Sequence, residues 1–256
     1  MPFTISHTAA ILPFNRKPFV LSALIIGSMS PDFLYFIPLI PNYHFTHTLP
    51  GLFLFCLPMS WVALLGFDRL IKRPLILLLP SLLQRRAVKV YKGFTFSKFS
   101  QCLWISLSII LGAYSHIVWD SFTHLTGKMV QLFPLLQQPI FTLWGETIFV
   151  YKFLQYGSTI IGGSIFMAWL LWQIKQEKPN SYLDKNPNKV SSLILPTIIV
   201  LSCSIGLISS YLWFTPLGLK IFVVQTVITS MSTFLSLLLL FSLGWHWLAM
   251  PEKKSY

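Results

Sequence analysis

Charged residues are scarce in this chain. Only 10% of its 256 residues are Asp, Glu, Lys or Arg, whereas 54% are hydrophobic. A water-soluble domain carries about a quarter charged residues, so this composition excludes a soluble enzyme, a disordered tail and a disulfide-rich secreted module. We therefore expect an integral membrane protein that has the lipid bilayer as its main partner.

Acidic residues and cysteines are the scarcest of the chemically active types. Seven acidic residues stand against 19 basic ones, which gives a formal net charge of +12. In a membrane protein this excess indicates topology and contact with anionic lipid headgroups rather than with nucleic acid. The three cysteines lie in apolar runs and are odd in number, so no disulfide framework is implied.

Long apolar runs predict an all-α fold, a polytopic transmembrane bundle of about six spans with additional re-entrant or interfacial helices. A span needs about 20 mostly apolar residues. The first candidate is interrupted by Ser30-Pro31-Asp32, which is typical of a helix start, so we expect two short helices, 19–29 and 31–39, or one kinked span. The segment 75–83 is too short to cross and is expected at the interface. The predicted spans are 18–39, 48–67, 99–119, 153–174, 191–214 and 221–250.

The basic residues orient these spans. With the N-terminus in the cytoplasm, all but three of the 19 basic residues fall in loops on the inner side; the exceptions are Lys128, Lys152 and Lys220. This asymmetry follows the positive-inside rule. We expect a multi-pass protein of the inner (plasma) membrane with both termini in the cytoplasm.

The histidines divide the chain into three parts. Residues 1–174 hold five of the six histidines and are the predicted metal-site region, residues 175–190 form a polar cytoplasmic linker, and residues 191–256 form a C-terminal pair of spans. His246 lies between two tryptophans and is typical of an aromatic belt, without a chemical role. The spacing Ser158-x3-Gly162 predicts a helix surface that another part of the chain can approach closely.

Two acids lie where an acid is costly. Asp32 and Asp120 are surrounded by apolar sequence, and an acid at the bilayer centre costs about 2.5 to 3.5 kcal/mol. The other acids that lie beside basic loop residues need no special account. The spacing of His116, Asp120 and His124 places all three on one stripe of a helix, where an imidazole and a carboxylate one turn apart can chelate one ion. The alternative is an interfacial helix end with exposed histidines.

Two further histidines complete a set with metal-ligand chemistry. His47 precedes a span and is the candidate ligand of its segment, whereas His44 is expected at the surface. His7 would carry no weight alone. Nitrogen and oxygen ligands favour zinc, with manganese or iron as alternatives, for one or two divalent ions. The candidate metal ligands are His7, Asp32, His47, His116 and Asp120.

Several segments resemble a family of bacterial multi-pass membrane proteins, a domain of unknown function. They are PFTISHTAAILP, LSALIIGSMSPDF, HTLPGLFLFCLP and YKFLQYGST, in that order and together with the His-x3-Asp helix. More distantly, the ligand order is similar to that of the LexA-regulated membrane-bound metal-dependent hydrolases and of the soluble zinc-dependent phospholipase C and P1 nuclease group. The resemblance implies that the five candidates ligate metal and that Asp120 bridges two ions.

The chain also departs from the soluble group. A later His-x3-acid pair of those enzymes is missing here. Glu146 is the candidate replacement, as a ligand or a general base, although it equally fits a loop carboxylate beside Lys152; His124 is a second catalytic candidate. The resulting hypothesis is a metal-dependent hydrolase that acts on a phosphoester or lipid-linked substrate at the membrane surface. A proton- or metal-coupled transporter and a non-catalytic scaffold are the alternatives.

The predicted topology conflicts with a shared site. It places His47, His116 and Asp120 near the outer face, but it starts His7 on the inner side. A common metal centre therefore requires either that the N-terminal segment re-enter the membrane, which we favour because residues 19–29 are too few to span it, or that the first crossing be incomplete with the N-terminus outside. A large distance between His7 and His116 would exclude such a centre.

Overall fold

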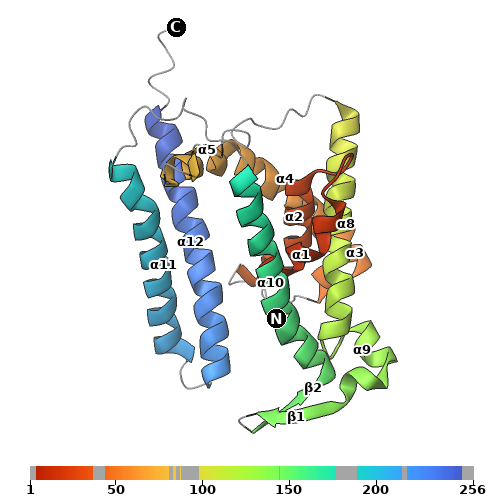
Figure 1. Ribbon diagram of the computed structural model, residues 1–256. Helices are drawn as coiled ribbons and strands as arrows, with labels where there is room; N and C mark the ends of the chain where they lie inside the picture. Colours follow the sequence, from red (N-terminus) through yellow and green to blue (C-terminus); the bar gives the residue numbers. More distant parts are fainter. Residues whose placement is uncertain are drawn as a thin grey trace. The chain divides into compact units, whose positions relative to one another are not determined.

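Helices make up almost all of the structure, a computed structural model that describes residues 4–36, 44–80, 83–84, 87, 98–143, 145–176, 189–214 and 218–249. Five helical stretches are long and apolar enough to cross a membrane (Figure 1). They are Leu49–Leu78, Phe99–Leu132, Val150–Gln176, Leu193–Phe214 and Ile221–Leu248. The predicted all-α polytopic bundle is thereby confirmed, and the first predicted span is a shorter apolar helical stretch, Leu21–Phe36.

The N-terminal segment consists of short helical pieces. In order they are η1 (Thr4–His7), α1 (Thr8–Ile11), η2 (Leu12–Phe14), α2 (Leu21–Met29) and η3 (Ser30–Phe36). The division that the sequence predicted at Ser30 is present, since α2 ends at Met29 and η3 begins at Ser30. The Ser30 hydroxyl donates to the Gly27 carbonyl oxygen at 2.8 Å, and the backbone passes from α2 into the 3₁₀ turns of η3 in a helical conformation.

The second stretch is one long helix with two π-turns. It is preceded by η4 (Phe45–His47) and contains α3 (Leu49–Gly51), η5 (Leu52–Cys56), α4 (Leu57–Gly66), η6 (Phe67–Ile71) and α5 (Lys72–Leu78). Thr48 is its N-cap, because the hydroxyl oxygen accepts from the Gly51 N–H at 3.1 Å. The sequence predicted an end at Asp68 and a separate interfacial segment. The helix continues because Lys72, one turn later, pairs with the Asp68 carboxylate and removes the need for water there.

The remaining elements are three long helices and a small hairpin. They are α8 (Phe99–Thr123), α9 (Lys128–Leu132), η7 (Pro134–Gln137), β1 (Pro139–Leu143), β2 (Glu146–Phe149), α10 (Val150–Gln176), α11 (Lys189–Phe214) and α12 (Leu219–Ala249). The antiparallel hairpin pairs Leu143 with Glu146, and Gly145 has a φ of +79°, which a tight turn favours. The sequence did not predict it. The predicted polar linker lies almost entirely outside the described residues.

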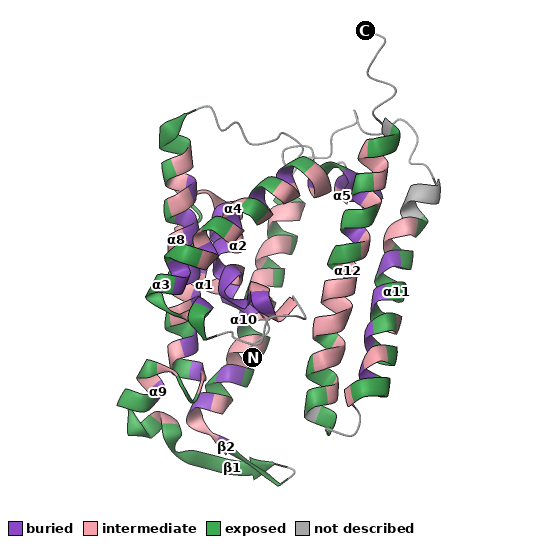
Figure 2. Ribbon diagram, turned by 180° about the vertical axis from the view of Figure 1, so that it is seen from behind, coloured by how far each residue is buried: buried purple, intermediate pink, exposed green. Residues whose placement is uncertain are grey.

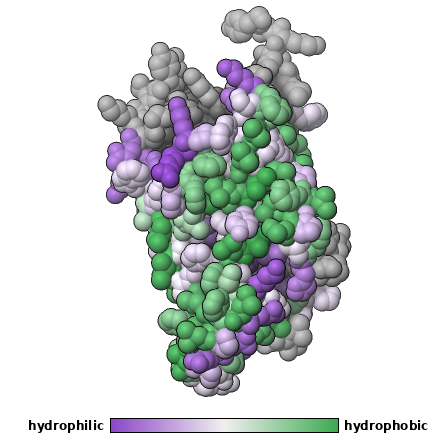
Figure 3. All heavy atoms as spheres, turned by 90° about the vertical axis from the view of Figure 1, so that its right-hand side faces the viewer, coloured by the Kyte–Doolittle hydropathy of each residue, from purple (hydrophilic) through white to green (hydrophobic). Residues whose placement is uncertain are grey.

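The chain divides into two compact units. The first contains Met1–Leu34, Ile40–Leu64 and Thr95–Gln173, and the second contains Tyr35–Leu39, Leu65–Phe94 and Ile174–Tyr256. In the second unit, Leu78, Ile198 and Leu238 form the core where α11 and α12 pack. The outward faces of the long helices are apolar, as a lipid-facing surface requires, and apolar side chains predominate on the face shown in Figure 3.

Glycines in the first unit allow α2 to lie directly against α8. A Cβ atom on Gly27 would overlap the backbone of Ile109, and one on Gly112 would overlap the carbonyl of Leu24. Figure 2 shows the buried residues gathered on α1, on α2 and along α8. This close approach brings the segment that follows α2 to the polar residues of α8.

Candidate metal centre

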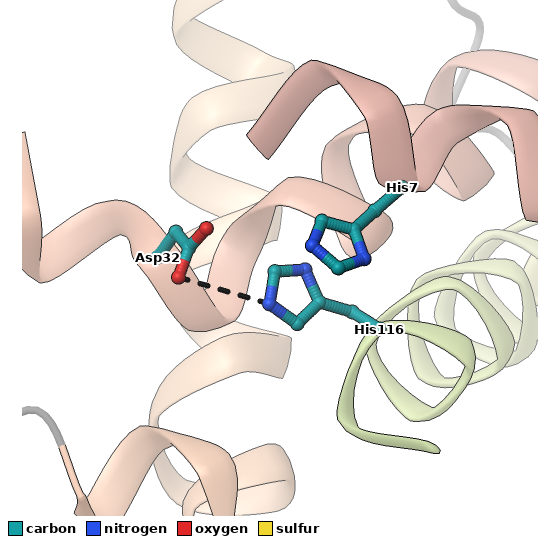
Figure 4. A group of neighbouring side chains, drawn as sticks. All are labelled: His7, Asp32 and His116. Carbon is teal, nitrogen blue, oxygen red and sulfur yellow. Dashed lines mark ion pairs between the residues drawn. The ribbon is translucent and has the colours of Figure 1, made fainter. Parts of the chain in front are cut away.

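The five predicted metal ligands come together in the first unit. They form two overlapping groups, His7 with Asp32 and His116, and His47 with His116 and Asp120. Within each group the ligand atoms lie within 4.8 Å of one another. Figure 4 shows the first group, with Asp32 from η3, His7 from the N-terminal segment and His116 from α8.

The N-terminal segment reaches the level of His116, as a shared centre requires. The His7 and His116 rings are stacked with centroids 3.8 Å apart, and Trp119 meets the His7 ring edge-on at 6.5 Å. Gly162 of α10 makes room for this segment, since a Cβ atom there would lie 2.7 Å from the Ser6 carbonyl oxygen. The close packing that the Ser158-x3-Gly162 spacing predicted is therefore made against the residue next to His7.

The distances around the two carboxylates fit a tetrahedral ion. His116 Nε2 lies 3.3 Å from Asp120 Oδ2 and 3.7 Å from Asp32 Oδ1. His47 Nε2 lies 3.4 Å from each of the same two oxygens. Bonds of about 2.0–2.1 Å to zinc place tetrahedral ligand atoms roughly 3.3 to 3.5 Å apart. Three of the four separations therefore have the size expected between ligand atoms of one zinc ion, and the fourth, from His116 to Asp32, is longer.

Neighbouring groups fix which nitrogen of His116 and of His47 faces the carboxylates. His116 Nδ1 lies 2.7 Å from the Ser28 carbonyl oxygen, which can only accept, so Nδ1 carries the hydrogen. The Thr46 hydroxyl donates to the Pro31 carbonyl oxygen at 2.8 Å and accepts from His47 Nδ1 at 3.1 Å. Nε2 of each ring therefore faces the carboxylates and can offer its lone pair to an ion that takes the place of a proton there, as in zinc sites whose histidines are oriented by outer partners.

Several buried polar atoms of the cluster have no hydrogen-bond partner within the part of the chain that the structure describes. They are both ring nitrogens of His7, Nε2 of His116 and Oδ1 of Asp120. His7 is only 2% exposed and His116 is fully buried. A buried polar group without a partner costs about 1 to 3 kcal/mol. Several such atoms that converge on one point therefore fit an external cation.

His7 and His47, the two histidines of the cluster that lie outside the spans, have opposite protonation tendencies. Burial, together with the nearby His116, lowers the pKa of His7 to about 3, so its ring is neutral and offers a nitrogen lone pair. Burial also disfavours the charged form of His47, but hydrogen bonds to Asp120 and Asp32 outweigh it and raise its pKa to about 10. Without a metal ion, a proton on His47 partly balances the two carboxylates.

The two catalytic candidates lie in different places. His124 caps the end of α8, with Nδ1 3.5 Å from Asp120 Oδ1, and thus borders the cluster without belonging to either group. Glu146 lies on β2, where its side chain is 55% exposed and its carboxylate is 3.9 Å from Lys152 Nζ. The structure brings His124 to the cluster and keeps Glu146 out of both groups.

Two other residues near the cluster, Thr4 and Gln155, were not predicted as part of it. Thr4 donates to Asp32 Oδ2 at 2.7 Å, and the side-chain amide of the buried Gln155 lies 3.1 Å from His124 Nε2. The only signal for Gln155 is an amide within an apolar span. The two histidines that were given no role are placed as expected, because His44 is exposed and His246 contacts the Leu70 carbonyl oxygen at 3.0 Å.

Comparison with known proteins identifies one family. The model of a domain of unknown function, DUF4184, matches residues 1–243. No curated protein and no solved structure matches the chain. The comparisons thus support the uncharacterised membrane-protein family and give no support to the more distant resemblance to hydrolases and nucleases.

Proposed function

The chain belongs to the DUF4184 family of unknown function, and we propose that it is a metal-dependent hydrolase of the membrane. The His/Asp cluster binds a divalent ion, preferably zinc, and the substrate is a phosphoester or a lipid-linked compound. The observation that carries this proposal is the set of buried, unpartnered nitrogen atoms of His7 and His116 around two carboxylates. Without an ion, the proton on His47 offsets at most one of the two buried carboxylate charges, whereas a divalent ion offsets both.

The ligand set assigns separate tasks to its members. Asp32 and Asp120 supply the negative charge, while His47 and His116 supply oriented nitrogen atoms to the same ion. Asp120 Oδ1 is turned away from that group, toward His7 Nε2 at 3.5 Å, and is thus free to reach a second ion. A bound divalent ion would supply a Lewis acid and lower the pKa of a water molecule to about 7.

The accessible edge of the cluster indicates where a substrate enters. The side chains of His7 and His116 are almost fully buried, whereas those of Asp120, His47 and His124 are 12%, 22% and 30% exposed. His124 contacts Asp120 on this edge and is therefore the group that we assign to proton transfer between the site and the outside. Of the two catalytic candidates, the geometry favours His124 over Glu146.

Elemental analysis of the detergent-purified protein tests the metal site directly. We expect one or two equivalents of zinc per wild-type chain and almost none in Asp120→Ala or His116→Ala. The matched control is Glu146→Gln, which changes an exposed acid and should keep the wild-type metal content. Wild-type protein without stoichiometric metal, after purification and after incubation with zinc, would overturn the proposal.

Hydrolysis is tested separately with the zinc-loaded protein. Bis(p-nitrophenyl) phosphate and a phosphatidic-acid vesicle serve as soluble and lipid phosphoester probes. We expect turnover by wild type that is lost in Asp120→Ala and lowered in His124→Ala. Zinc binding without turnover of either probe, combined with zinc flux into liposomes, would replace the hydrolase by a metal transporter.

A further inference from the structure

The segment between α8 and α10 presents an unusual apolar surface. We call residues 128–149, which comprise α9, η7 and the β1–β2 hairpin, the connecting ribbon. Its large hydrophobic side chains point outward, with exposed fractions of 69% for Leu132, 65% for Leu135 and 53% for Phe133. Within β1 itself all five residues are exposed, including Ile140, Phe141 and Leu143. Patches of this kind mark an interaction surface in most proteins.

The shape of the connecting ribbon is fixed by hydrogen bonds. The Gln137 side-chain amide donates to the Val130 carbonyl oxygen at 2.8 Å, and the Val150 N–H donates to the Gln138 carbonyl oxygen at 3.0 Å. Phe149 stacks on Tyr151 of α10 with ring centroids 5.8 Å apart. The apolar side chains are therefore held in place on the outside. An isolated two-stranded hairpin is at best marginally stable in water, so this one needs a covering partner.

Both ends of the connecting ribbon are joined directly to membrane spans. Its first helix, α9, belongs to the stretch Phe99–Leu132, and β2 ends at Phe149, immediately before α10. No polar stretch separates the ribbon from either span, and its charged residues are only Lys128 and Glu146. Two consecutive spans leave the bilayer on the same side, so the ribbon starts and ends at one bilayer surface.

We propose that the connecting ribbon lies in the headgroup layer of the bilayer, with Leu132, Phe133, Leu135 and Phe141 inserted among the lipids. The occupant of its apolar surface is lipid, because the surface continues that of the two spans to which it is joined. Figure 3 shows apolar side chains extending toward the lower end of the view, the end at which Figure 1 places the hairpin. This proposal is independent of the metal centre, although His124, four residues before α9, then lies beside the headgroups.

Spin labelling in nanodiscs of phosphatidylethanolamine and phosphatidylglycerol tests the proposal. Single cysteines replace Leu135 or Phe141 in a chain whose Cys102 and Cys203 are changed to serine; the buried Cys56 is kept because a label cannot reach it. The measured quantity is the ratio of nitroxide collisions with oxygen to those with a water-soluble nickel chelate. Ile205→Cys, an exposed position in a span, provides the lipid reference, and Gln176→Cys, exposed at a helix end, provides the water reference.

We expect ratios at both ribbon positions several-fold above that of Gln176→Cys and closer to that of Ile205→Cys. A ratio equal to that of Gln176→Cys would show a ribbon in water and overturn the proposal. Spin–spin broadening that disappears when labelled protein is diluted with unlabelled protein would show a second copy on this surface and would also overturn it. Because neither readout depends on metal or turnover, failure here is distinguishable from failure of the proposed function.

Discussion

Buried acids occur in both compact units, but they are compensated differently. In the second unit the Asp68 carboxylate pairs with the Lys72 ammonium one helical turn away, and both side chains are buried. In the first unit, Asp32 and Asp120 meet imidazole rings, several of whose nitrogen atoms have no partner among the described residues. Thus the Asp68 site carries a permanent cation, whereas the cluster has only histidines, of which His47 holds a proton when no metal ion is bound.

The difference shows how a structural acid is distinguished from a functional one. A lysine remains charged at neutral pH, so the Asp68–Lys72 pair is complete and only allows the helix to continue. Histidine is neutral or charged depending on its surroundings, and its neutral form is a metal ligand. Burial of an acid in a membrane helix is therefore not sufficient evidence for a site. The chemical type of the partner distinguishes a structural acid, paired with lysine, from a functional one, paired with histidine.

The largest predicted effect concerns the buried Asp68–Lys72 ion pair. Asp68→Ala leaves the buried Lys72 ammonium without its carboxylate, and loss of one partner of a buried ion pair costs about 3 to 5 kcal/mol. We expect that decrease in the free energy of unfolding, measured by denaturant titration in mixed micelles, with zinc content unchanged.

The double variant Asp68→Leu with Lys72→Met controls for the loss of charge. It replaces the pair by apolar side chains and should recover most of the stability, since such replacements are often neutral or stabilising. Loss of zinc in Asp68→Ala would show that the two acid sites are coupled and would remove the distinction between them.

Zinc should stabilise the folded protein through the His/Asp cluster of the first unit and not through the Asp68–Lys72 pair. A ligand at 100 to 1,000 times its Kd adds about 2.7 to 4.1 kcal/mol to the free energy of unfolding. We expect zinc addition to chelator-stripped wild type to raise the unfolding temperature, measured by intrinsic fluorescence. Asp120→Asn, of nearly equal size, should lose this response, and Asp68→Ala should retain it. An equal response of wild type and Asp120→Asn would contradict a site at Asp120.

A smaller effect is expected from the hydroxyl that orients His47. Thr46→Val removes the oxygen that accepts from His47 Nδ1 while it keeps the side-chain volume. Loss of such an outer partner typically lowers metal affinity 10- to 100-fold. Competition with a fluorescent zinc chelator measures the change. Ser60→Ala is the matched control, because this buried hydroxyl has no hydrogen-bond partner in the described part of the chain; equal zinc affinities of the two variants would argue against the orienting role.

The spans and the gathering of the candidate ligands were accessible from the sequence because both depend on local features; that these residues bind a metal ion stays a prediction. Apolar runs determine which segments enter the membrane, and the spacing of His116 and Asp120 places them on one helix face. The position of His7 beside His116 was harder to predict, since it depends on the stacking of its ring on His116 from a distant part of the chain. No local pattern encodes that contact.

Two further features escaped sequence reasoning for related reasons. Asp68 stands next to Arg69 and close to Lys72, which is typical of a loop, but the spacing of four lets the charges pair within a helix. Gln155 is one amide in an apolar span, and only the tertiary fold brings it to His124.

The hairpin also escaped prediction, because its short strands give too few residues for a period-two pattern.

The smallest predicted effect tests whether zinc binding by the His/Asp cluster depends on the close approach of α10 to the N-terminal segment. In Gly162→Ala the new Cβ atom would lie 2.7 Å from the Ser6 carbonyl oxygen, so η1, which ends at His7, must shift. We expect a loss of about 1 kcal/mol in the free energy of unfolding, the lower end of overpacking effects, because a terminal segment yields more easily than a core helix. Gly163→Ala, with nothing within 4 Å of its new Cβ atom, is the control on the same helix and should be neutral or slightly stabilising.

The zinc affinities of the two variants then show whether His7 is a ligand. If Gly162→Ala weakens zinc binding and Gly163→Ala does not, His7 contributes to binding of the ion. Zinc affinity that is unchanged in Gly162→Ala, despite the loss of stability, would assign His7 to packing and confine the metal centre to the ligands around Asp32 and Asp120.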